Sequence, residues 1–104
     1  MSQQTPQNSY FATIQDHSDA DCLSRRTAAL EPHIAGLKSL KQNSFLQTAG
    51  GTFDKDGKMS GSILLYNADT EQQVREMVEN DPFCKERVWD INTLVIQRAF
   101  IPTL

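Results

Sequence analysis

His33 and Asp81 are the residues of this 104-residue chain whose types and surroundings point most directly to chemistry. His33 follows Pro32 inside a stretch with helical periodicity, and Asp81 precedes Pro82 at the expected end of a second helix. A histidine exchanges a proton near neutral pH, and a carboxylate bonded to its second ring nitrogen fixes the tautomer and stabilises the imidazolium. A pair of this kind could work as a general acid and base.

Both residues also have ordinary structural interpretations. A single histidine in a helix is more often a surface residue or a satisfied core residue, and an Asp before Pro is more often part of a helix-terminating turn. From the residues alone, catalysis is the less frequent outcome. A contact between His33 and Asp81 does not follow from their positions in the sequence.

Arg26 is a candidate anchor for a substrate. Its guanidinium group, like that of Arg25, carries forked donors that suit a carboxylate. Most helix arginines instead lie in water or pair with nearby acids, here Asp19 and Asp21. We therefore treat Arg26 as a possible anchor only.

Three further positions are candidates for substrate contacts. Gly50 lies inside an expected strand, where glycine marks either a bulge or a close approach of another group, and the bulge is at least as frequent. Ser62 offers a hydroxyl beside Gly61, but no base in its motif marks it as a nucleophile. Phe83 supplies aromatic bulk for a core or a pocket wall.

Composition excludes several classes of partner. The net charge of -3 gives no broad positive field, so we expect no nucleic acid partner and no attraction to an anionic membrane surface. Residues 1–9 lack the features of a secretory signal, and no apolar run is long enough for a membrane span, so we expect a cytoplasmic protein. Cys22 and Cys84 are too scattered for a disulfide framework or a zinc site. We expect no metal and no cofactor.

The first half of the chain predicts a strand and a helix. Residues 10–15 alternate and are rich in aromatic and β-branched types, which favours a strand. Helical periodicity over 22–42 predicts one amphipathic helix. Pro32 should kink that helix or mark a fresh start within it. The apolar residues that recur at spacings of three, four or seven are Leu23, Leu30, Ile34, Leu37 and Leu40.

The middle of the chain predicts a hairpin and a second helix. Residues 45–53 and 59–66 are extended candidates, and the polar loop between them contains Asp56-Gly57, which readily adopts positive φ. Residues 69–73 have the form of a capped helix start. Val74, Met77 and Val78 mark the buried stripe of that helix, which should end near Asn80 because Pro82 follows.

The last segment, residues 88–100, predicts a strand that is apolar on both faces. Its alternation places Trp89, Ile91, Thr93 and Val95 on one face and Leu94, Ile96 and Phe100 on the other. Two helices can cover only one face of a sheet. We therefore expect the face that carries Trp89, Ile91 and Val95, or their neighbours in the alternate register, to be covered by a second subunit.

The order of these elements is β-α-β-β-α-β, which predicts an α+β, ferredoxin-like domain with an antiparallel sheet and both helices on one face. The length allows a single domain, over residues 10–104, after a flexible polar segment at 1–9. This scaffold hosts many functions, so function has to be argued from the site.

A set of short motifs in this order and spacing narrows the choice. They are the strand ending in Asp16; Arg25-Arg26 followed by Pro32-His33-Ile34 and Leu37; Ala49-Gly50; Gly61-Ser62; and Asp81-Pro82-Phe83 followed by Val88-Trp89-Asp90. Together, from about Tyr10 to Ile96, the chain resembles the YCII-related (YciI-like) domain family. One departure is Gly51, where members often carry proline.

The resemblance implies a dimeric α+β barrel with an active site built on a His and an Asp, here His33 and Asp81. The leading hypothesis is a small-molecule enzyme that uses this pair for proton transfer in a reaction of the lyase, isomerase or dehalogenase type. The alternative is a non-catalytic metabolite-binding or dimeric assembly module, in which His33 only completes a hydrogen-bond network.

Overall fold

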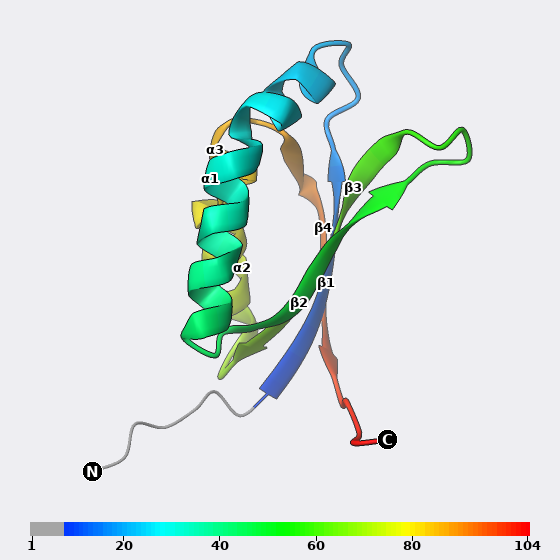
Figure 1. The fold of residues 1–104 in the computed structure, drawn as a ribbon. Helices are drawn as coiled ribbons and strands as arrows, with labels where there is room; N and C mark the ends of the chain where they lie inside the picture. Colours follow the sequence, from blue (N-terminus) through cyan, green and yellow to red (C-terminus); the bar gives the residue numbers. More distant parts are fainter. Residues whose placement is uncertain (1–7) are drawn as a thin grey trace.

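A computed structural model describes residues 8–104 as one antiparallel sheet with all its helices on one face (Figure 1). The strand order β2-β3-β1-β4 is that of a ferredoxin-like fold and confirms the predicted α+β class. No helix within residues 8–104 combines the length and the apolar character needed to cross a membrane. The elements in chain order are β1 (Asn8–Asp16), α1 (Cys22–Gln42), β2 (Leu46–Phe53), β3 (Met59–Ala68), α2 (Glu71–Asn80), α3 (Pro82–Lys85) and β4 (Trp89–Ala99).

The start of the chain is only partly described. The flexible segment expected at 1–9 falls largely on residues 1–7, which lie outside the described residues. Its last two members, Asn8 and Ser9, belong to β1 and pair with Ala68 and Asn67 of β3. The strand therefore begins before Tyr10, where the alternating pattern begins.

The helix α1 has the predicted bounds but does not restart at Pro32. It runs as one helix from Cys22 to Gln42 with Pro32 inside it. The proline has no backbone N–H to donate, so the helix lacks one hydrogen bond at this turn. The helix nevertheless continues past it.

The buried side of α1 differs from the predicted one. Leu23, Leu30 and Ile34 are 64%, 44% and 41% exposed, while Leu37 and Leu40 only border the core. The residues that face the sheet are small or polar: Cys22, Arg26, Ala29 and His33. The apolar spacing identified the helix correctly and its buried face wrongly, because the buried face carries the candidate site residues.

The hairpin of β2 and β3 forms as predicted. Gly57 turns the loop with a φ of 80°. Gly61 lies where the backbone of β1 approaches, and a side chain there would clash with the carbonyl oxygen of Ile14. Close approach therefore explains the need for glycine at this position.

The second helical region is divided by Pro82. Thr70 caps α2 by accepting from the amide of Gln73, and the Gln73 side chain accepts from the amide of Asp69. Asp81 leaves the helical region, since it precedes a proline, and α3 starts at Pro82. The short helix α3 is an element that the sequence pattern did not reveal.

A bulge in β4 corrects the predicted faces of the last strand. Between the pairs Thr13–Val95 and Gln15–Asp90, β1 advances by two residues and β4 by five. This odd difference reverses the alternation. The prediction that Trp89 and Val95 share a face is therefore wrong: Trp89 is buried under the helices, while Val95 is 52% exposed.

The face of the sheet without helices carries apolar side chains. Strand register places Phe11, Ile63, Leu65 and Val95 on this face, which we call the open sheet face. Phe11 and Ile63 are each 38% exposed. The apolar surface expected there is therefore present, although Trp89 is not part of it.

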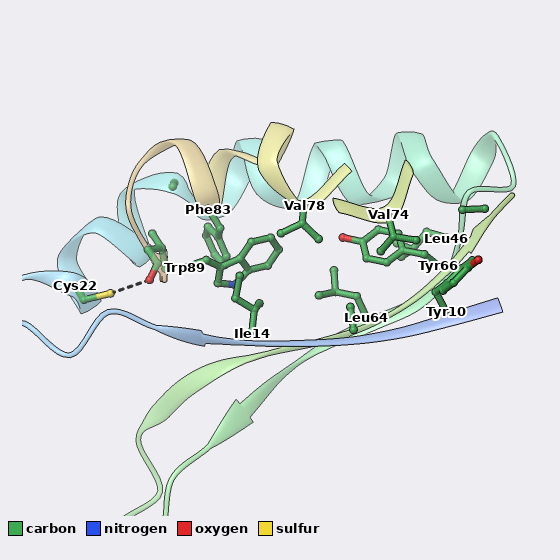
Figure 2. Close-up of a cluster of buried hydrophobic side chains, with 14 residues drawn as sticks. Tyr10, Ile14, Cys22, Leu46, Leu64, Tyr66, Val74, Val78, Phe83 and Trp89 are labelled. Carbon is green, nitrogen blue, oxygen red and sulfur yellow. Dashed lines mark hydrogen bonds between the residues drawn. The ribbon is translucent and has the colours of Figure 1, made fainter. Parts of the chain in front are cut away.

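The core lies between the sheet and the helices (Figure 2). Tyr66 is fully buried in the same cluster as Val74 and Val78 of α2. Among residues 8–104, its hydroxyl has no hydrogen-bond partner. Burial, together with the charge of Asp81, raises the pKa of this phenol.

Tyr66→Phe should therefore be harmless at neutral pH. We expect the free energy of unfolding to stay equal or to rise by up to about 1 kcal/mol, because an unpaired buried hydroxyl is costly to desolvate. The raised pKa means that folded protein loses stability as pH rises above about 10, the ordinary value for tyrosine. Tyr66→Phe should lose less stability than the wild type in that pH range. Urea unfolding at neutral and alkaline pH measures both differences in stability. A clear loss of stability by Tyr66→Phe at neutral pH would contradict the expectation that the variant is harmless there.

Candidate active site

The structure brings His33 and Asp81 together in the interior. Nδ1 of His33 lies 2.7 Å from Oδ1 of Asp81, and their side chains are 7% and 4% exposed. A carboxylate oxygen at this position accepts the Nδ1 proton, which leaves Nε2 as the ring nitrogen available for chemistry. Nε2 makes no hydrogen bond to any other group within residues 8–104.

Asp81 is held in place by the break between α2 and α3. Its backbone amide donates to Val78, at the end of α2, and its Oδ1 accepts from the amide of Phe83, at the start of α3. The same oxygen that caps α3 therefore also receives His33. This double use explains why an Asp-Pro pair at a helix end can also be part of a site.

Two aromatic residues fix the plane of the imidazole. The Phe83 ring stacks on His33 with 3.7 Å between centroids and 7° between planes. Trp89 meets His33 edge to face, at 5.4 Å and 86°. With Nδ1 bonded, one face stacked on Phe83 and an edge against Trp89, His33 has little freedom to turn.

A second buried network lies beside the first. The Nε of Arg26 donates to Oδ2 of Asp16 at 2.8 Å, and its Nη2 donates to the carbonyl of Gly61 and to Oγ of Ser62. Trp89 Nε1 also donates to Oγ of Ser62, at 3.0 Å. Arg26 lies 4.9 Å above the Phe83 ring, which links the two networks.

A cavity of about 240 Å³ opens onto both networks. His33, Arg26 and Ser62 line its polar part, while Leu30 and Ile34 belong to its apolar part. We call this space the His33 cavity. Hollows of about 450 and 670 Å³ lie elsewhere on the surface, but His33 lines neither. The chemistry of the lining, rather than size, selects the smaller one.

The candidate substrate-binding residues divide into two groups. Arg26, Gly50 and Ser62 line the His33 cavity. Phe83 is fully buried, stacks on His33 and is not among the lining residues. Its place in the structure is that of a support for the imidazole.

The pairing of Asp16 with Arg26 was missed from the sequence. The acids considered for the two arginines were Asp19 and Asp21, and Asp19 does pair with Arg25, at 2.7 Å. Asp16 ends a strand ten positions before Arg26, so no helical spacing connects them. Within residues 8–104, no group of three or more His, Cys, Asp or Glu side chains is placed to hold a metal ion.

Comparisons with known proteins identify the family of this chain. The family model of the YCII-related domain matches residues 9–95. The chain belongs to the YCII-related domain family. It is similar in structure to the 5-chloro-2-hydroxyhydroquinone dehydrochlorinase of Burkholderia phenoliruptrix, solved in complex with 2,5-dihydroxybenzoquinone. The two are 26% identical with a TM-score of 0.72, over 88% of this chain and 93% of that one.

Two curated relatives come from fungi. Fusaric acid biosynthesis protein 2 of Gibberella fujikuroi is 27% identical over 93 residues, which are 84% of this chain and 88% of that protein. An aspartate kinase of Fusarium oxysporum f. sp. lycopersici is 28% identical over 93 residues, but the chain spans only 17% of its length.

The buried pair of Asp16 and Arg26 should be strongly coupled. We expect Asp16→Asn and Arg26→Met each to lower the free energy of unfolding by about 3 kcal/mol, because each leaves a buried group without its partner. The double variant should lose clearly less than the two losses added together. Urea unfolding of the four proteins measures the coupling, and simple additivity would contradict it.

Asp19→Asn is the matched control. The Arg25 guanidinium holds the pKa of the Asp19 carboxyl well below its usual range, but this pair lies at the surface. Solvent screens such pairs, so this variant should change stability much less than Asp16→Asn.

Proposed function

We propose that the chain is an enzyme that moves protons on a small organic molecule in the His33 cavity, in a reaction of the lyase, isomerase or dehalogenase type. The observation that carries the proposal is the buried contact of His33 with Asp81 at 2.7 Å, beside a cavity that His33 lines. Homology to a dehydrochlorinase and to fusaric acid biosynthesis proteins supports a role in small-molecule chemistry.

Each residue has a distinct part in the proposed reaction. Neutral His33 accepts a proton from the substrate at Nε2, and the released electron pair stays on the substrate or expels a leaving group such as chloride. The imidazolium that results is stabilised by the Asp81 carboxylate at Nδ1. The proton then passes to the product or to solvent, which returns His33 to its neutral form.

Replacement of His33 tests the catalytic role. With 5-chloro-2-hydroxyhydroquinone as the first substrate to be tried, His33→Gln should lower the rate of chloride release about 100-fold or more, the usual contribution of a general base. The control is His17→Gln, since His17 is the other histidine of the chain and does not line the cavity. Full turnover by His33→Gln, on this or any other substrate, would contradict the proposal and favour a non-catalytic binding module.

The proposal includes a homodimer joined through the open sheet face. Phe11, Ile63 and Val95 leave apolar surface on the side of the sheet that no helix covers. Burial of such surface is the main driving force for association. A second copy offers the same apolar surface, which makes a symmetric contact possible.

A charge on the open sheet face should separate the subunits. We expect the wild type to have the mass of a dimer in light scattering at micromolar concentration and Val95→Lys to have the mass of a monomer, because a buried unpaired charge is costly. Leu23→Lys is the control, since Leu23 is even more exposed than Val95 but lies on α1. A monomeric wild type would refute the dimer.

A further inference from the structure

The His33 cavity has an unusual distribution of charge. His33 and Arg26 line it, but their carboxylate partners, Asp81 and Asp16, do not. Both acids lie behind the groups that they bind. No carboxylate among residues 8–104 lines the cavity, while the Arg26 guanidinium does, which favours a ligand with a negatively charged oxygen.

The polar groups of the wall also have unused donors. Ser62 Oγ accepts from Arg26 Nη2 and from Trp89 Nε1, so its own O–H remains free to donate. Arg26 bonds through Nε and Nη2, and its Nη1 makes no hydrogen bond within residues 8–104. Donors held in place by their other bonds are suited to an oxyanion, because they need no reorganisation when it binds.

The rest of the cavity is apolar. Leu30 and Ile34 of α1 and Met59 and Leu64 of the sheet line it. Leu30 and Ile34 are 44% and 41% exposed at its rim, so an apolar ligand would remove part of this surface from water. The volume of about 240 Å³ limits the ligand to a small molecule.

The balance of charge distinguishes between classes of anion. Among residues 8–104, Arg26 is the one arginine that lines the cavity, and its charge is already paired with that of Asp16. A doubly charged phosphate would therefore lack counter-charge. An enolate or phenolate carries one charge and delocalises it into a carbon body that the apolar wall can bury.

We propose that the His33 cavity selects ionised phenols or enols, with the oxygen at Ser62 and Arg26 and the carbon body against Leu30 and Ile34. This inference rests on the proposed function and names its substrate class. It also assigns Ser62 and Arg26 the task of stabilising the oxygen anion while His33 handles the proton.

The probe is 4-nitrophenol, whose phenolate is coloured and whose neutral form is not. Added protein should increase the phenolate fraction at a fixed, slightly acidic pH, because the cavity binds the anion preferentially. We expect 4-nitrophenol to bind about tenfold or more tightly than 4-nitroanisole, which has the same ring and no acidic oxygen, a difference of about 1.4 kcal/mol. Equal binding of the two, or equal binding of inorganic phosphate, would overturn the inference.

Two variants and one control test whether the binding occurs in this cavity. Ala49→Leu adds volume to the cavity wall and should abolish the colour change, whereas Ala35→Leu, on the exposed side of α1, should leave it intact. Ser62→Ala removes the free O–H and should lower the preference for 4-nitrophenol over 4-nitroanisole about tenfold. A preference that survives both Ala49→Leu and Ser62→Ala would place the anion elsewhere and overturn the inference.

Failure of the inference can be told from failure of the proposed function. If 4-nitrophenol binds as the phenolate but His33→Gln keeps full turnover, the acid-base role is wrong and the ligand class stands. If His33→Gln loses turnover but the cavity does not prefer the phenolate, the ligand class is wrong and the acid-base role stands.

Discussion

The Asp81 carboxylate is the group on which the site depends. One of its oxygens caps α3 through the amide of Phe83 and receives His33 from α1, while its backbone amide ends α2 at Val78. Three helices therefore meet at one buried acid. Because a buried carboxylate is stable only when its hydrogen bonds are made, the helix packing and the geometry of His33 are set together.

The Trp89 side chain joins that acid-centred cluster to the sheet. It packs edge to face against His33 and Phe83 and donates its indole N–H to Ser62 on β3. It can do so because the bulge in β4 turns this end of the strand toward the helices. An irregularity in an edge strand thus places an aromatic residue in the site, and such bulges often re-aim side chains next to active sites.

The two faces of the sheet differ in the side chains that they carry. The helix face buries its polar groups in pairs, with Asp16 on Arg26 and Asp81 on His33. The open sheet face carries apolar residues and none of these pairs. A protein built this way could associate through one face without disturbing the hydrogen bonds that hold the cavity on the other.

The sequence by itself determined the order of the elements, the bounds of α1, the hairpin and the break at Asp81-Pro82, because caps, prolines and alternation are local signals. Only the tertiary structure decided which side of α1 is buried, which acid pairs with Arg26 and where β4 changes face. The physical reason is that these depend on partners distant in the chain. Arg26 and His33 can be buried because Asp16 and Asp81 bond to them in the interior. The spacing of residues along α1 does not predict these contacts.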